Sequence, residues 1–345
     1  LRRQKIVDKL LLLKVKISSA QNFFHWQKLS KYLEIGHGID FKDLLVRQFD
    51  DPSIGQFTIS HKCILVTGAG GSIGSEICRQ LVRQDIVDLI LIENGEFNLY
   101  SIDQALRGII RLENLKVRVW PILANIRDLS KIQQVFDQFK PQVVYHAAAF
   151  KHVPLLETNP IEAIQNNFFA TFELGKIAIQ NKVQCFVLIS SDKAVRATNV
   201  MGASKRLAEL SMQLFADQKP STVFTMVRFG NVIGSSGSAI PLFQSQILQG
   251  GPVTVTHPEV TRYFMSVDEA VELVLRTGEM AKGGEVFVLD MGKPIKIVDL
   301  VRRMIRLNGK VEKTEENPGG DIKIDYIGFR PGEKMHEELI LGEKL

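Results

Sequence analysis

Short apolar runs alternate with amphipathic segments from about residue 60 to residue 228. The apolar runs are β-branched and have the length of buried strands, and the segments between them repeat apolar residues at helical spacing. Strands are expected at 63–66, 88–92, 116–122, 143–145, 183–189 and 222–227, and helices at 129–139, 160–180 and 202–215. In the last helix Leu207, Leu210 and Leu214 are expected to face inward. The rhythm predicts the α/β class, with a doubly wound parallel sheet.

Composition narrows the possible functions. The 43 basic and 38 acidic residues give a net charge of +5 without a long basic block, so a nucleic-acid partner is not expected. Cys63, Cys78 and Cys185 lack metal-ligand spacing and are expected to be buried thiols of a reducing compartment, with no metal site. The leucine run at 10–13 is too short to span a bilayer. A cytoplasmic location is predicted.

The first expected strand leads into a glycine-rich loop, TGAGGSIG at 67–74. Gly68, Gly71 and Gly74 have the spacing G-x-x-G-x-x-G, and Ser72 and Ile73 lie between the last two. Glycine lets the backbone approach a pyrophosphate, and the following helix presents free N–H groups to it. These five residues are predicted to bind a dinucleotide.

The ends of the next strands support a dinucleotide site. Glu93 follows the loop by about 20 residues, where an acid accepts hydrogen bonds from the adenosine ribose. Its carboxylate would repel a 2′-phosphate, so NAD is predicted rather than NADP. The other residues predicted to line the cofactor site are Asn125, Ile126, Ala147, Ala148 and Ala149. Tight packing under a helix explains the three alanines equally well.

The loop after the strand at 183–189 carries the strongest candidate chemistry. Ser191, Asp192 and Lys193 follow the carboxyl end of that strand, and ligands bind at this edge of open α/β sheets. Lys205 follows Met201 by four residues and therefore lies on the same face of the expected helix. An isolated Asp-Lys pair would be interpreted as a solvated ion pair, so its functional meaning depends on the neighbouring motifs.

Several motifs in one order resemble a known family. They are TGAGGSIG, Glu93, HAAAFKHVP at 146–154, SSDKAVRATNVMGASKR, RFGNVIGSSGSAIPLF and RPGEK. From about residue 60 onward the chain looks like an extended short-chain dehydrogenase/reductase. More narrowly, it is similar to the large bacterial UDP-N-acetylglucosamine 4,6-dehydratases of polysaccharide biosynthesis and protein glycosylation. Met201 stands where most short-chain dehydrogenases have the tyrosine of Tyr-x-x-x-Lys, and in the resembling family Met marks the long-chain branch.

The resemblance implies a domain plan. Residues 1–60 would be an N-terminal extension or linker from a preceding domain, and 61–228 an NAD-binding Rossmann domain. Residues 229–345 would mainly form a smaller C-terminal substrate-binding lobe, with some segments returning to the Rossmann core. The resemblance also implies a homo-oligomer, with a dimer favoured. The full-length protein could be tethered at the cytoplasmic face of the inner membrane through upstream segments absent from this chain.

The resemblance also implies a reaction, in which the sugar is oxidised at C4, loses water across C5 and C6, and receives the hydride back at C6. Lys193 would be the C5 base, Asp192 the acid at the C6 oxygen, and Lys205 a ligand of the nicotinamide ribose. The group that accepts the C4 hydroxyl proton stays open among Asp192, Ser191 and a water molecule. The residues expected to bind the UDP-sugar are Lys151, His152, Asn231, Arg262, Arg330 and Glu333.

Two alternatives remain. One is a nucleotide-sugar epimerase or a 5-inverting dehydratase of the same fold, although both generally use the tyrosine that Met201 replaces. The other is a non-catalytic dinucleotide-sensing protein, in which loss of that tyrosine would mark lost catalysis.

Overall fold

The chain folds into two compact units in a computed structural model that describes residues 60, 62–235 and 237–340. The larger unit contains the described residues of Asp51–Gly230, Val267–Asp290 and Glu338–Leu345, and the smaller one contains those of Asn231–Ser266 and Met291–Glu337. The predicted N-terminal extension, residues 1–60, lies outside the described residues except for residue 60.

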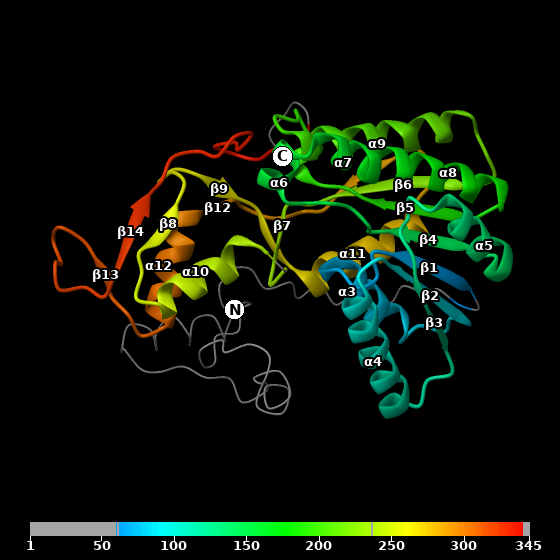
Figure 1. The fold of residues 1–345 in the computed structure, drawn as a ribbon, viewed down its shortest axis with the longest axis horizontal. Helices are drawn as coiled ribbons and strands as arrows, with labels where there is room; N and C mark the ends of the chain where they lie inside the picture. The colour runs from blue at the N-terminus through cyan, green and yellow to red at the C-terminus, as the bar shows by residue number, and fades with distance from the viewer. Residues whose placement is uncertain (1–59, 61, 236, 341–345) are drawn as a thin grey trace. The chain divides into compact units, whose positions relative to one another are not determined.

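The larger unit is built on a seven-stranded parallel sheet with the order β11-β6-β5-β4-β1-β2-β3 (Figure 1). The strands are β1 (Cys63–Thr67), β2 (Asp88–Glu93), β3 (Arg118–Leu123), β4 (Val143–His146), β5 (Cys185–Ile189), β6 (Val223–Arg228) and β11 (Val286–Val288). The predicted doubly wound parallel sheet is therefore confirmed. Strand order reverses between β1 and β4, which is where such sheets form a ligand crevice.

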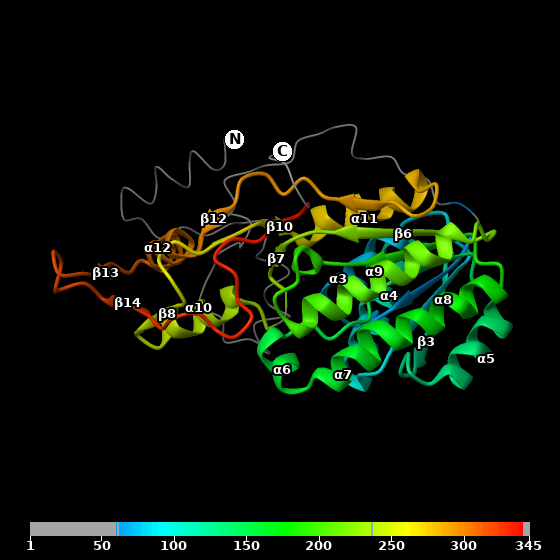
Figure 2. The same cartoon turned by 90° about the horizontal axis from the view of Figure 1, so that it is seen from above.

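Helices cover both faces of this sheet (Figure 2). One face carries α3 (Ser72–Leu81), α4 (Glu96–Glu113) and α11 (Val267–Met280), and the other carries α5 (Leu129–Phe139), α8 (Ala170–Gln180) and α9 (Val200–Asp217). The main core lies under the second group, and Phe136, Leu174, Met212 and Phe186 of β5 are among its buried residues. Burial on both faces explains why the central strands are apolar throughout.

The buried face of α9 differs from the prediction. Leu207, Leu210 and Leu214 are 37%, 45% and 52% exposed, so the expectation that they face inward is wrong. The buried face instead includes Lys205 and Glu209. These charged residues bind polar groups at the strand ends, and their burial turns the leucines outward. The apolar pattern alone therefore marked the wrong face.

The expected helix at 160–180 contains a change of helical type. It begins as α7 (Pro160–Ile164), passes through the π-helical turn η4 (Gln165–Phe169) and continues as α8. The short helix α6 (Val153–Thr158) precedes it, and the 3₁₀ turn η5 (Asp192–Ala194) follows β5. Single π-helical turns inside helices are frequent at functional sites.

The smaller unit combines two helices with short strands around its own core. Its elements are β7 (Asn231–Ile233), α10 (Ala239–Leu248), β8 (Val253–Val255), β9 (Thr261–Arg262), β10 (Phe264–Ser266), β12 (Ile295–Lys296), α12 (Ile297–Leu307), β13 (Glu312–Lys313) and β14 (Ile322–Tyr326). Pairing joins β10 with β7, β12 with β9, and β14 with both β13 and β8. Phe243, Val301 and Ile322 are among the buried residues of this core.

All three cysteines are free. Cys78 and Cys185 are buried, as predicted, whereas Cys63 is only half-buried at the start of β1. The expectation of full burial is therefore wrong for Cys63.

Candidate active site

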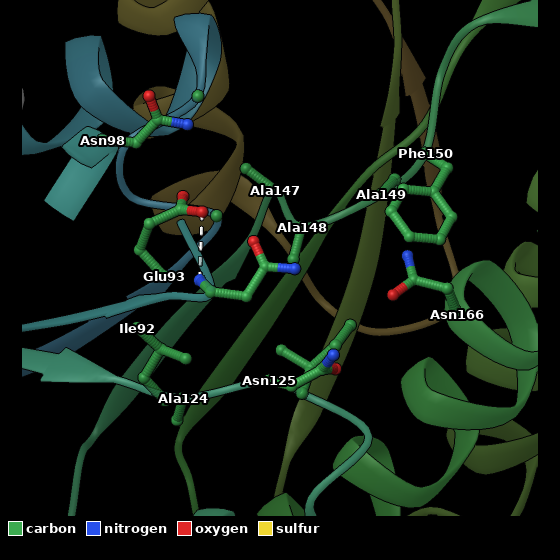
Figure 3. Close-up of a pocket in the computed structure, with 14 residues that line it drawn as sticks. Ile92, Glu93, Asn98, Ala124, Asn125, Ala147, Ala148, Ala149, Phe150 and Asn166 are labelled. Carbon is green, nitrogen blue, oxygen red and sulfur yellow. Dashed lines mark hydrogen bonds between the residues drawn. The ribbon is translucent and has the colours of Figure 1, made fainter. Parts of the chain in front are cut away.

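A pocket of about 200 Å³ lies at the carboxyl ends of the strands, where the strand order reverses (Figure 3). The predicted cofactor residues that it brings together are Gly68, Gly71, Glu93, Asn125, Ile126, Ala147, Ala148 and Ala149. Ile92, Asn94, Asn98, Ala124, Phe150 and Asn166 also line it. The pocket therefore gathers residues that follow four different strands.

Glycine is required at two points of the loop after β1. Gly68 has a φ of +65°, and a Cβ there would lie 2.8 Å from backbone atoms of Ala148. A Cβ on Gly74 would lie 2.0 Å from the carbonyl oxygen of Gly68. Gly74 therefore lets α3 pack on the loop, and it does not line the pocket. Ser72 and Ile73 form the first turn of α3 beside it and are likewise not among the lining residues.

Glu93 is buried at the end of β2, and backbone groups orient its carboxylate. Oε1 accepts the N–H groups of Asn94 and Gly95 at 3.0 and 2.9 Å, and Oε2 accepts that of Gly70 at 2.9 Å. Each carboxylate oxygen can accept two hydrogen bonds, so Oε2 retains capacity for another donor. The arrangement fits a ribose hydroxyl and also ties the glycine loop to β2.

Asn94, Asn98, Phe150 and Asn166 are the polar and aromatic lining residues that sequence reasoning missed, and Figure 3 labels the last three. Asn98 lies on α4, and a Cβ on Gly70 would touch it, so the glycine loop and α4 are in close contact. Asn166 lies in the π-helical turn η4. No sequence signal separates this turn from an ordinary helix, whereas HAAAF at 146–150 placed Phe150 directly after a strand.

The loop after β5 holds a buried acid beside a lysine. The side chain of Asp192 is 1% exposed, and its Oδ1 accepts Lys193 Nζ at 3.0 Å and Ser191 Oγ at 2.8 Å. Asp192 Oδ2 is buried and has no hydrogen-bond partner among the described residues. A buried carboxylate oxygen without a partner is costly, so this atom is suited to bind a ligand.

Lys205 is buried on α9, and its Nζ donates to the carbonyl oxygen of Ile189, the last residue of β5, at 2.5 Å. Burial lowers the pKa of Lys205 to about 8, and the negative charge of Glu209 one turn along opposes this shift. Lys205 thus anchors α9 to the strand from which the Ser191–Lys193 loop emerges.

Met201 is buried in a small apolar cluster with Leu156 of α6 and Ala163 of α7. A thioether is at most a weak hydrogen-bond acceptor and cannot transfer a proton. Packing therefore accounts for the Met201 side chain, which offers no group for proton transfer.

Three of the substrate residues predicted for the smaller unit, Arg262, Arg330 and Glu333, form one polar cluster. Arg262 Nη2 lies 2.9 Å from Glu333 Oε1, and Thr256 Oγ1 donates to the same oxygen at 2.9 Å. The backbone N–H of Arg330 donates to Glu333 Oε2 at 3.2 Å. Asn231 lies at the start of β7 in the same unit. Glu333 thus orients the side chain of Arg262 and the backbone of Arg330.

Lys151 and His152 belong to the larger unit, directly after the pocket residue Phe150. Burial lowers the pKa of Lys151. His152 is the N-cap residue of α6 and is exposed. Both residues therefore continue the segment that lines the cofactor pocket.

The chain matches known proteins along most of its length. The family model described as "Polysaccharide biosynthesis protein" matches residues 64–345. The capsular polysaccharide biosynthesis protein CapD of Staphylococcus aureus is 50% identical over 317 residues, which cover 90% of this chain and 51% of that protein. The chain thus spans about half the length of CapD. The UDP-glucose 4-epimerase of Rickettsia akari is 34% identical over 288 residues, covering 82% of this chain and 79% of that protein.

Solved structures share the fold. Pen from Bacillus thuringiensis is 34% identical, with a TM-score of 0.72 over 83% of this chain and 84% of that one. The UDP-glucose 4-epimerase of Thermus thermophilus, solved with NAD, has a TM-score of 0.65 at 19% identity over 80% of this chain and 90% of that one. At such low identity the second match supports the fold alone.

Proposed function

The chain belongs to the polysaccharide biosynthesis protein family, and we propose that it is an NAD-dependent UDP-N-acetylglucosamine 4,6-dehydratase. The observation that carries the proposal is the contact between buried Asp192 and partly exposed Lys193, in which Asp192 Oδ2 has no partner among the described residues. An acid and a base side by side at the carboxyl edge of a parallel sheet suit an elimination reaction.

The pocket residues fit NAD. Bare glycine backbone at Gly68 and Gly71 gives a pyrophosphate room, and the N-terminus of α3 follows directly. The remaining acceptor capacity of Glu93 suits the adenosine ribose. Lys205 would hold the nicotinamide ribose. NAD, when bound, supplies an acceptor that takes hydride from C4 of the sugar and returns it at C6, so it is not consumed.

Asp192 and Lys193 would divide the elimination between them. Oxidation at C4 makes the C5 hydrogen acidic, and Lys193 removes that hydrogen as a proton. Asp192 delivers a proton to the C6 oxygen, so the C6–O bond breaks and water leaves. The hydride then arrives at C6, a proton returns to C5, and the net change is the loss of one water molecule. Ser191 Oγ donates to Asp192 Oδ1, so Ser191 is one candidate for accepting the C4 proton, provided that it passes its own hydrogen to the Asp192 carboxylate. Asp192 would then carry the proton that it delivers to the C6 oxygen.

The UDP part of the substrate would be bound by the cluster in the smaller unit. Arg262 and Arg330 are suited to a diphosphate, because a guanidinium offers several donors in a fixed plane. Glu333 would hold Arg262 in place. Asn231, Lys151 and His152 would complete the sugar contacts.

A 4-epimerase is the second candidate, and the 34% identity to the Rickettsia akari epimerase favours it. An epimerase returns the hydride to C4 and needs an acid and base only at the C4 oxygen. Such an enzyme does not need the Asp192–Lys193 pair for a C5 proton and a C6 hydroxyl. The side chain that stands in the usual tyrosine position, Met201, packs among apolar residues.

Incubation with UDP-N-acetylglucosamine separates the candidates. A dehydratase gives a product lighter by one water molecule, in which proton NMR shows a new C6 methyl signal and no C4 proton. An epimerase gives a product of unchanged mass with inverted configuration at C4, which changes the coupling constants of the C4 proton. A dinucleotide-sensing protein binds NAD and leaves the sugar unchanged. Asp192→Asn is the matched control, because it keeps the size of the side chain and should suppress dehydration.

Assembly and location stay predictions. We propose a homo-oligomer, with a dimer favoured, acting in the cytoplasm on precursors of a surface polysaccharide. Within residues 62–235 and 237–340, none of the helices is both long and apolar enough to cross a bilayer. Tethering to a membrane would depend on segments upstream of this chain.

A further inference from the structure

His146 is a buried imidazole with no part in the proposed chemistry. It is the last residue of β4 and directly precedes Ala147, Ala148 and Ala149 of the pocket. The ring is 1% exposed and lies between two buried hydroxyls. Its Nδ1 is 2.7 Å from Thr67 Oγ1, and its Nε2 is 2.8 Å from Thr171 Oγ1.

The neighbouring groups fix the direction of these hydrogen bonds. Thr171 Oγ1 donates its only hydrogen to the carbonyl oxygen of Asn167 at 2.9 Å, so it must accept a hydrogen from His146 Nε2. The neutral ring therefore accepts at Nδ1 from the Thr67 hydroxyl, whose oxygen in turn accepts the N–H of Ala148 at 3.3 Å. Burial and the positive charge of Lys205 lower the pKa of His146 to about 3, which keeps the ring neutral.

Asn167 continues the hydrogen-bond network toward α9. Its side-chain amide accepts the N–H of Phe150 at 2.8 Å and donates to the carbonyl oxygen of Phe150 at 2.9 Å. It also donates to Ser204 Oγ on α9 at 3.1 Å. Ser204 immediately precedes Lys205. The pocket wall from Ala147 to Phe150 is therefore held at one end by Thr67 and at the other by Asn167.

We propose that His146 is a positioning residue that couples the glycine loop to the π-helical turn and thereby sets the wall of the NAD pocket. The proposal rests on the proposed function, because NAD is the ligand concerned. An apolar residue would fill the same space under the sheet. It would leave Thr67 and Thr171 without a common partner, and their hydroxyls would no longer hold the wall through one connected network.

A double-mutant cycle on NAD binding tests this coupling. Thr67→Val and Thr171→Val each remove one hydroxyl with little change in shape, and the two threonines are linked through His146. Each single variant should weaken NAD binding by calorimetry roughly threefold to tenfold, the effect of one buried hydrogen bond. The double variant should weaken it no more than the stronger single one. Effects that multiply would show two independent packing positions and would overturn the proposal.

Conservative replacements of the His146 ring test for a difference in NAD affinity that packing alone would not produce. His146→Asn can keep a link to Thr67, and His146→Gln can keep one to Thr171. Both should bind NAD better than His146→Leu even where all three melt at the same temperature. Equal NAD affinities in the three variants would count against His146 as a positioning residue.

Hydrogen exchange separates this proposal from the proposed function. If the wild-type chain fails to bind NAD, the proposed function fails, and the coupling is then measured without ligand. Thr171→Val should speed exchange of the Ala148 amide, whose hydrogen-bond acceptor is Thr67 and not Thr171. Unchanged exchange at Ala148 would show that His146 transmits nothing between the two threonines.

Discussion

Gly202 of α9 lies so close to Lys193 that a Cβ on this glycine would come within 2.1 Å of the lysine carbonyl oxygen. The helix that carries Lys205 therefore packs directly on the backbone of the loop that carries Asp192 and Lys193. Backbone atoms cannot move aside as a flexible side chain can. The absence of a side chain at position 202 thus determines where the acid–base pair lies.

Gly202→Ala should impair turnover more than it impairs folding. The added methyl must displace the Lys193 backbone, and a displacement near 1 Å at a reacting group can cost on the order of a hundredfold in rate. The matched control is Gly108→Ala on α4, where a Cβ would meet no atom within 4 Å. That change should stabilise the chain by about 0.5–1 kcal/mol and leave turnover intact. Wild-type turnover in Gly202→Ala would contradict the close contact.

Cofactor preference should depend on Glu93. NAD should bind more tightly than NADP, because the Glu93 carboxylate would face the additional phosphate. Glu93→Gln removes the charge and one acceptor oxygen, so we expect NAD affinity to fall roughly tenfold to a hundredfold and the gap to NADP to narrow. Calorimetry with both nucleotides measures the effect, and the exposed Glu96→Gln serves as the control. Equal affinities of the wild type for the two nucleotides would refute the assignment.

The sequence predicted the sheet well because its central strands are buried on both faces and are therefore continuous apolar runs. The helix expected at 129–139 has the same bounds as α5, where Asp128 caps the first turn by accepting the N–H of Lys131. Pocket residues were predictable where they end a strand or directly follow one, as Glu93 and Ala147 do. Such positions are fixed by local sequence.

Features that depend on tertiary contacts were not predictable. Asn166 enters the pocket through a π-helical turn, and the turn has no signature in the residue pattern. The leucines of α9 were assigned to the wrong face, because Lys205 and Glu209 are buried by pairing with distant groups. The contact between Arg262 and Glu333 joins residues far apart in sequence.

Met201 should tolerate an apolar replacement. Met201→Leu roughly conserves volume in the cluster with Leu156 and Ala163, so it should cost less than about 1.5 kcal/mol of stability and keep turnover within a few-fold. Met201→Ala should destabilise the fold by about 2–5 kcal/mol through the cavity it leaves. Urea unfolding and turnover assays check both. A folded Met201→Leu chain that binds NAD but does not turn over would show a direct role in the chemistry.

Lys205 should make stability depend on pH in the alkaline range. Its pKa is lowered by burial from 10.5 to about 8, so the folded chain releases this proton before the unfolded chain does. The cost of burying the charge is fully present below about pH 8 and is relieved as pH rises toward 10.5. The unfolding free energy of the wild type, measured relative to Lys205→Met, should therefore increase across that interval. If the difference in unfolding free energy between the two proteins stays constant with pH, the pKa of Lys205 is not lowered in the folded chain.

Solvent deuterium tests the central claim, that Lys193 removes the C5 proton while Asp192 donates a proton to the C6 oxygen. In deuterated water the wild type should give a product that carries deuterium at C5, detected by mass and proton NMR. Asp192→Asn should retain C5 exchange better than it retains water loss. Lys193→Ala should still bind UDP-N-acetylglucosamine, yet incorporate deuterium about a hundredfold to ten-thousandfold more slowly, the usual effect of removing a positioned base. Incorporation by Lys193→Ala at the wild-type rate would show that another group is the base.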